Sequence, residues 1–192
     1  CALIAALLVA PSWASFAMGT GIARVPNPTS TDQGYGIALQ RDGKIVVAGR
    51  CGESGAKLCV ARLNADGAMD ATFNANGAVP GKRVIDGLSM HTSSFLRAVK
   101  VAIAADGKIV VATTCDVSNV DNFCLARLNP DGSYDEAFDG PDVANPGNGR
   151  FGLRITTSLG EALSDFALQR IDGRIMLVGQ CANYACVARL KS

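Results

Sequence analysis

Three short apolar runs stand out in the pattern of hydrophobic and polar positions. They are Ile45–Ala48, Ile109–Ala112 and Ile175–Val178, and an Asp-Gly pair comes shortly before each of them. An Asp-Gly pair between apolar segments is typical of a β-hairpin turn. A strand that is apolar on both faces belongs to a sheet that is covered on both sides. The pattern therefore predicts short, stacked β-strands.

The runs belong to a longer segment that repeats along the chain. Asp-Gly-Lys-Ile-Val-Val-Ala begins at Asp42 and at Asp106, and Asp-Gly-Arg-Ile-Met-Leu-Val begins at Asp172. A Cys-x-Ala-Arg-Leu segment follows each of them, starting at Cys59, Cys124 and Cys186. The copies return with a period of about 65 residues, so the chain holds three units of one kind.

Each unit is expected to contain four strands. In the first unit they are Gly21–Val25, Gly36–Gln40, Lys44–Arg50 and Leu58–Leu63. In the later units the first two strands are expected near Lys82–Ile85 and Val99–Ala104, and near Arg150–Thr156 and Asp165–Gln169. The units then cover about residues 18–66, 77–131 and 147–192 and hold twelve strands.

We therefore predict an all-β fold of three repeated four-stranded antiparallel units, packed as in a β-propeller. A β-trefoil, which also has twelve strands, is the alternative. Propellers typically have about four to eight blades. Three units would therefore also fit half of a six-bladed ring or a fragment of a longer protein. The strands that are apolar on both faces favour blades, because stacked blades cover both faces.

The repeated units resemble the delta-60 repeat family. Its units read roughly Asp-Gly-Lys-Ile-Val-Val-Ala-Gly, then Ala-Arg-Leu-Asn-x-Asp-Gly-x-x-Asp-x-x-Phe. The matching segments are Asp42–Gly49 with Ala61–Phe73, Asp106–Ala112 with Ala126–Phe138, and, in the third unit, Asp172–Gly179 with Ala188–Leu190. The resemblance implies a β-propeller-like array in bacterial exported or surface proteins, and it assigns no catalytic residues. The chain departs from the family in having three units and paired cysteines.

The composition of the chain narrows the fold and the kinds of partner further. The chain has 192 residues, which is the length of one domain. It carries 18 Lys and Arg against 17 Asp and Glu, a formal net charge of +1. Proteins that bind nucleic acid usually carry a basic excess, so no nucleic-acid partner is expected. The 21 glycines and the 6% aromatic residues suit short strands and tight turns.

The N-terminal segment has the pattern of an export signal. Ala2–Ala10 is apolar, and small residues at Ala14 and Ala17 offer cleavage sites. The apolar run is too short for a membrane span. We predict a partial signal peptide over residues 1–17 and a secreted, periplasmic or cell-surface protein that spans no membrane. A buried first strand, a short anchor or a lipid-bearing Cys1 are the alternatives.

The cysteines also point to export. Of the seven, six fall in three close pairs: Cys51 with Cys59, Cys115 with Cys124, and Cys181 with Cys186. Each pair brackets the loop after an apolar run, where neighbouring strands bring cysteines within disulfide distance. An even count in an exported chain supports oxidation. No Cys-x-x-Cys is present and His91 is the single histidine, so no metal or cofactor is expected.

Catalytic patterns are weak. His91 has Ser89, Ser93 and Ser94 nearby, but no Gly-x-Ser-x-Gly segment occurs. Asn64-x-Asp66-Gly67 resembles a calcium loop faintly, and turn chemistry explains it without a metal. We therefore expect a structural or surface-binding module, with a hydrolase or lactonase-like enzyme on a propeller scaffold as the alternative. Arg62 and Arg127 are expected to form structural ion pairs with Asp70 and Asp135.

The loops sort into two rims. One rim holds near-identical Asp-Gly turns, and the other holds loops that differ in every unit: Asn27–Gln33, Gly52–Leu58, Gly87–Ser94, Asp116–Phe123, Ser158–Ser164 and Ala182–Ala185. Repeat proteins often bind through such a rim, although unconstrained loops also drift. The candidate binding residues are Glu53, Lys57, His91, Asp116, Asn119, Asp121, Asn122, Asn183 and Tyr184.

Two kinds of partner are expected. A protein or glycan of unknown identity would bind the variable rim. A second copy would pair through the sheet edges near Gly21–Val25 and Cys186–Leu190, because unpaired strand edges recruit other strands. Such a homodimer would have six blades and a two-fold, isologous contact.

Overall fold

The computed structural model describes residues 22–25, 32–52, 57–90, 99–117, 120–138, 150–153 and 161–190. These residues contain eleven strands and no helix. The strands are β1 (Gln33–Leu39), β2 (Ile45–Cys51), β3 (Lys57–Leu63), β4 (Lys82–Met90), β5 (Val99–Ile103), β6 (Ile109–Val117), β7 (Val120–Leu128), β8 (Arg150–Leu153), β9 (Glu161–Leu168), β10 (Ile175–Cys181) and β11 (Tyr184–Leu190).

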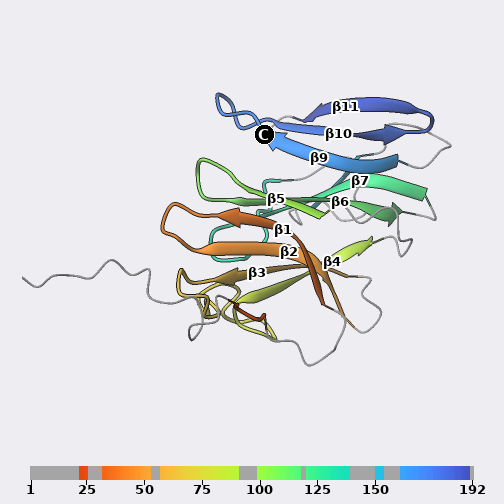
Figure 1. Ribbon diagram of the computed structural model, residues 1–192. Helices are drawn as coiled ribbons and strands as arrows, with labels where there is room; N and C mark the ends of the chain where they lie inside the picture. Colours follow the sequence, from red (N-terminus) through yellow and green to blue (C-terminus); the bar gives the residue numbers. More distant parts are fainter. Residues whose placement is uncertain are drawn as a thin grey trace, which may run out of the picture.

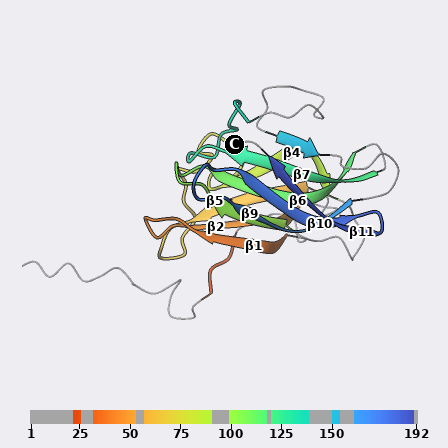
Figure 2. The same cartoon turned by 90° about the horizontal axis from the view of Figure 1, so that it is seen from above.

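The strands form three stacked layers (Figure 1). The first layer is β1–β4, the second is β5–β8 and the third is β9–β11, and strands that follow one another within a layer pair antiparallel. The end of β4 also pairs with β6 through Ser89 and Met90, so the first two layers share one eight-stranded sheet. The view from above shows the layers lying over one another (Figure 2).

The repeated Asp-Gly turns close the hairpins in the same way in the first two layers. Gly43 and Gly107 both have φ 84, in the left-handed region that glycine adopts without strain. The Asp42 side chain accepts a hydrogen bond of 3.1 Å from the Lys44 N–H, and Asp106 does the same for Lys108. The predicted turn chemistry therefore positions the strands that follow it.

Two hydrophobic cores lie between the layers, and β6 contributes to both. Ile109 and Val111 lie in the core between the first and second layers. Val110 and Ala112 lie in the core between the second and third layers. Neighbouring residues of a strand point to opposite faces, so β6 is covered on both sides as its sequence predicts.

The expected strand at Gly21–Val25 is wrong for the residues described, because residues 22–25 are irregular. Pro26 follows directly, and proline has no N–H to donate to a sheet. The observed strands therefore number eleven rather than twelve in the described residues. The predicted signal peptide, residues 1–17, lies outside the described residues.

Several predicted loops are shorter than expected because the strands beside them are longer. β4 continues to Met90, into the predicted loop Gly87–Ser94, and β9 begins at Glu161, inside the predicted loop Ser158–Ser164. β6 and β7 likewise take up most of the predicted loop Asp116–Phe123. Strand pairing extended these segments although their polar residues resemble a loop, because paired backbone groups satisfy their own hydrogen bonds.

Candidate functional site

The hairpins β2–β3, β6–β7 and β10–β11 all turn at the same rim, which we call the disulfide rim. It carries the three predicted disulfides: Cys51–Cys59, Cys115–Cys124 and Cys181–Cys186. In each hairpin the two cysteines are diagonal neighbours across the ladder; Cys51 pairs with Lys57, and Cys59 pairs with Gly49. The Cα atoms lie 6.0 Å apart in the first pair and 5.8 Å apart in the other two, within the range that a disulfide spans.

A groove of about 430 Å³ opens beside the first disulfide. Its walls come from the end of the β2–β3 hairpin, the segment 74–79 and the start of β4. The lining residues are Cys51, Gly52, Lys57, Asn74, Gly77, Ala78, Val79, Lys82, Arg83, Val84 and Asp86. Three of these carry a positive charge and one a negative charge, so the lining has a cationic excess.

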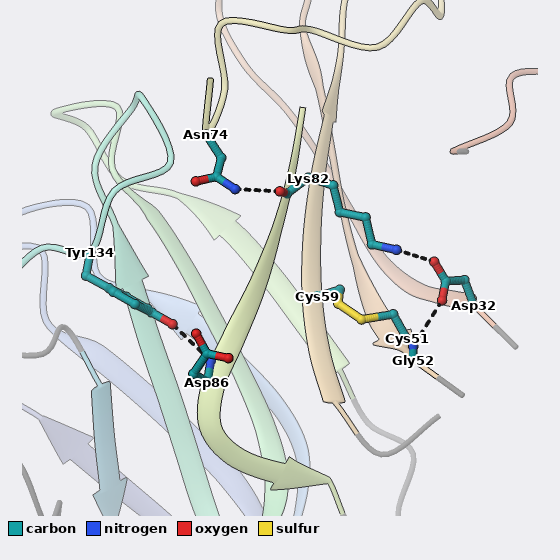
Figure 3. The surroundings of a disulfide bond; sticks show 8 residues. All are labelled: Asp32, Cys51, Gly52, Cys59, Asn74, Lys82, Asp86 and Tyr134. Atoms are coloured by element: carbon teal, nitrogen blue, oxygen red, sulfur yellow. Dashed lines mark hydrogen bonds and ion pairs between the residues drawn. A yellow bond between two sulfur atoms is a disulfide. The ribbon is translucent and has the colours of Figure 1, made fainter. Parts of the chain in front are cut away.

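Asp32 ties the disulfide loop to β4 (Figure 3). Its carboxylate forms an ion pair with the Lys82 ammonium, and it accepts a hydrogen bond of 3.3 Å from the Gly52 N–H. Lys82 is only 7% exposed, so its ammonium is paired in a largely buried position. A charge-assisted contact of this kind fixes the position of both groups.

Asn74 holds the residues of the groove wall that faces Lys57 through hydrogen bonds. Its side-chain amide donates a hydrogen bond of 2.7 Å to the Lys82 carbonyl, and its side-chain oxygen accepts one of 3.1 Å from the Arg83 guanidinium. Arg83 lies over the Tyr134 ring at 4.2 Å from the centroid, and the Tyr134 hydroxyl accepts a hydrogen bond of 3.0 Å from the Asp86 N–H. Tyr134 comes from the segment after β7, so a second-layer residue holds this wall of the groove, and Figure 3 shows its hydroxyl at Asp86.

The structure separates the predicted rim residues. Lys57 is exposed and lines the groove. Asn183 and Tyr184 are exposed at the β10–β11 turn, where Tyr184 keeps 77% of its surface accessible. These three therefore lie at two different hairpins of the disulfide rim.

The prediction that Asn122 lies on an exposed rim is wrong. Asn122 belongs to β7, pairs with Cys115 and is only 3% exposed, because the β6–β7 hairpin extends past it. Asp121 is half-buried in the same strand. Asp116 lies in β6, and its side chain is outside the described part of the chain, as are Glu53, His91 and Asn119.

Sequence reasoning missed Asp32, Asn74, Lys82 and Arg83. The available signal was Lys82-Arg83 at the start of a predicted strand, since two adjacent cations place a charge on each face of that strand. The partners of these residues, Asp32 and Tyr134, are about 50 residues away in sequence, and their contacts arise from layer stacking.

The opposite rim contains a buried charge cluster in each of the first two layers. Arg62 donates to Asp70 at 2.7 Å, and Arg127 donates to Asp135 at 2.5 Å, so both expected ion pairs are present. Phe73 and Phe138 each lie against the guanidinium of their layer's arginine. The clusters fix the chain after the second Asp-Gly turn.

Lysines complete both clusters and lower the aspartate pKa values. Lys44 lies 3.0 Å from Asp70, and Lys108 lies 2.9 Å from Asp135. Burial acts to raise the pKa of Asp70, but hydrogen bonds from Thr72 and Lys44 outweigh it and hold the pKa well below its ordinary value. Burial likewise acts on Asp135, and hydrogen bonds from Lys108 and Arg127 lower its pKa. Both carboxylates are therefore structural anions.

Asn64–Asp70 forms a turn in which the Asp66 side chain accepts a hydrogen bond of 2.9 Å from the Ala68 N–H. Within the described ranges, no group of three or more His, Cys, Asp and Glu residues is placed to hold a metal ion. Over the same residues, no helix is long and apolar enough to cross a membrane.

Comparison with known families agrees with the repeat pattern. A family described as a domain of unknown function (DUF5122), β-propeller, matches residues 40–73 and 104–138. Each stretch runs from the turn before β2 or β6 to the phenylalanine of the charge cluster. No curated protein matches the chain. The match supports a β-propeller-like repeat family, and the three disulfides indicate an oxidising environment.

Proposed function

We propose that this chain is an exported array of delta-60 repeats, with the three layers as propeller blades, and that it serves as a binding module. One observation carries the proposal: the two rims are built differently. The rim opposite the disulfide rim carries the Asp-Gly turns, and these turns have the same geometry in the first two layers. The disulfide rim places a covalent clamp at the same point of every layer while its loops differ in sequence. Rigid hairpins that present variable residues are suited to recognition.

The groove beside Cys51–Cys59 supports an acidic glycan as the ligand. Its exposed cation is Lys57, and the guanidinium of Arg83 and the amide of Asn74 add donors on the facing wall. Carboxylated sugars offer acceptors that match such donors. The volume of about 430 Å³ is within the usual range for a small-ligand site.

Calorimetric titration with oligogalacturonate tests this proposal, with a neutral malto-oligosaccharide of equal length as the control ligand. Binding should be specific to the acidic sugar and should weaken as salt rises, because screening reduces the attraction. Lys57→Glu should weaken binding about tenfold, since it reverses the exposed charge in the groove. Arg41→Glu makes the same change on the opposite rim and should leave binding unaltered. Equal binding of both sugars, or equal losses in both variants, would exclude the groove as an acidic-glycan site.

Export has its own test. Amino-terminal sequencing of protein recovered from the cell exterior or periplasm should give a start at Ser15 or Met18, after one of the two small-residue sites. A retained Trp13 would contradict cleavage at either site.

A further inference from the structure

Two apolar sheet faces are exposed at opposite ends of the stack. The first-layer face, which we call the leading face, carries Ile37 and Leu39, with 68% and 71% of their surfaces exposed. The third-layer face, which we call the trailing face, carries Val178 and Val187, with 39% and 68% exposed. Val178 and Val187 are directly paired across β10 and β11, so they share that face. Contiguous exposed apolar side chains of this kind mark contact surfaces.

The repeat itself shows what covers a leading face. Leu39 pairs with Ile45 just before the Asp-Gly turn, as Ile103 pairs with Ile109 in the second layer and Leu168 with Ile175 in the third. Ile103 packs into the core formed with the first layer, and Leu168 packs into the core formed with the second. The face that corresponds to Leu39 is therefore covered by the preceding layer wherever such a layer is present.

The trailing face follows the same rule in the opposite direction. The paired residues Val178 and Val187 correspond to the pair Ala48 and Val60 in the first layer. Both residues of that first-layer pair are fully buried in the core formed with the second layer. The trailing face is thus the surface on which the following layer packs.

A hollow of about 340 Å³ lies on the leading face. Its lining includes Val47, Gly49 and Ala61 of the sheet together with residues 24–25. The corresponding second-layer residues Val111 and Ala126 are fully buried against the first layer. The hollow therefore occupies the place that a preceding layer would fill.

One polar contact crosses the interface between the first and second layers. The Arg62 guanidinium donates a hydrogen bond across the layers to the Pro130 carbonyl, in the Asp-Gly turn of the second layer. Arg189 has the place of Arg62 on the trailing face, since Arg62 pairs with Val46 and Arg189 with Met176. Ala65 has the place of Pro130 in the first layer and is exposed. A trailing face stacked on a leading face brings Arg189 to the Ala65 carbonyl.

We propose that the trailing face of one copy binds the leading face of a second copy, head to tail. Two copies joined in this way close into a ring of six layers with two identical contacts, each repeating the stacking seen inside the chain. The contact uses sheet faces, in contrast to the edge pairing expected from the sequence, and the closed pair of copies has two-fold symmetry. The proposal rests on the layer stacking and is independent of glycan binding at the groove.

Sedimentation velocity over a dilution series tests the proposal with the oxidised chain. Leu39→Asp places a charge on the leading face, and Val187→Asp places one on the trailing face; both side chains are exposed in the single copy, so folding should be unaffected. Each variant alone should dissociate at least about 100-fold more readily than the wild type, because the interface would bury an unpaired carboxylate. Ile171→Asp, in the exposed β9–β10 turn, should associate like the wild type.

Mixing the two variants identifies the geometry. Leu39→Asp protein keeps an intact trailing face, and Val187→Asp protein keeps an intact leading face, so an equimolar mixture should recover a dimer held by one contact. An interface that pairs two like faces gives no recovery on mixing. A wild-type monomer at every concentration, a single variant that still dimerises, or a mixture that remains monomeric would each overturn the proposal.

Discussion

The second and third layers carry the same motif but differ in what surrounds them. In the second layer Val110 and Leu125 are buried against the third layer. Their counterparts in the third layer are Met176, which is half-buried, and Val187, which is exposed. Both layers are apolar at these positions. The neighbouring layer, and not the sequence of the strand, therefore decides whether the face is buried.

The largest expected effect comes from truncating this matched pair. Leu125→Ala should lower the free energy of unfolding by about 3 kcal/mol, because it leaves a cavity between two layers. Val187→Ala should cost less than about 0.5 kcal/mol in the single copy, where the side chain is already in water. Urea denaturation at concentrations below self-association measures both values. Similar losses in both variants would mean that the trailing face is covered within one copy.

The disulfides of the second and third layers can be compared in the same way, by the stability that each contributes. Replacing Cys115 and Cys124 together by Ala should cost about 2 to 3 kcal/mol, because the unfolded chain regains the entropy of an open loop. Replacing Cys181 and Cys186 should cost about 2 kcal/mol, since that loop is shorter. Thermal denaturation under non-reducing conditions compares them.

Accessibility separates the same two disulfides more sharply. Cys115 and Cys124 are fully buried, whereas Cys186 is half-buried in the third layer. Partial reduction followed by alkylation and mass spectrometry should therefore label Cys181 and Cys186 first. Labelling of Cys115 before Cys186 in the native protein would show that the second layer opens more readily than its burial implies.

The charge clusters should make the free energy of unfolding depend on pH in the acidic range. Lys108 and Arg127 hold the pKa of Asp135 below its ordinary value of 3.8, although burial acts to raise it. A carboxyl whose pKa is lower in the folded state stabilises the fold above its unfolded pKa, and this stabilisation is lost as the pH falls through the folded pKa. Asp135→Asn should cost about 2 kcal/mol at neutral pH and much less below the folded pKa.

Urea denaturation between neutral pH and strongly acidic pH measures this difference. The wild type should lose stability below about pH 4, and Asp135→Asn should lose less over that interval. Arg170→Gln is the control in the β9–β10 turn of the third layer, where the arginine is exposed, and it should change neither the stability nor its pH dependence. Parallel pH curves for wild type and Asp135→Asn would contradict the role assigned to the cluster.

The sequence allowed the all-β class, the hairpin turns, the cysteine pairs and the ion pairs to be predicted, because each depends on residues close together in the chain. The prediction of a strand at Gly21–Val25 was wrong for residues 22–25, because the apolar residues there gave no information about a partner strand. The prediction that Asn122 lies on an exposed rim was wrong for a related reason. Its polar side chain is typical of a loop, but the β6–β7 ladder continues past it. Pairing partners, more than residue types, set the strand limits.

The groove was harder to foresee than the rim that contains it. Lys57 was found because the loop after Cys51 differs between units. Arg83 was missed because its position depends on Tyr134, which belongs to another layer. A single sequence without observed contacts cannot place residues that meet only through stacking, whereas a repeated motif identifies which faces are equivalent.

The smallest expected effect concerns the residue directly after the first cysteine of a hairpin, which is Gly52 after Cys51 in the first layer and Ala182 after Cys181 in the third. Gly52 has φ 89 and Ala182 has φ 55, so the first and third hairpins use a left-handed residue at the same point. Ala182→Gly should raise the free energy of unfolding by about 0.5 kcal/mol, because relief of left-handed strain exceeds the entropy that glycine adds to the unfolded chain. Gly52→Ala should lower it by about 1 kcal/mol through strain alone, since a Cβ there would be 3.8 Å from its nearest neighbour, Lys57. Matched thermal denaturation of the two variants measures both changes, and the same sign in both would show that the two hairpins turn differently.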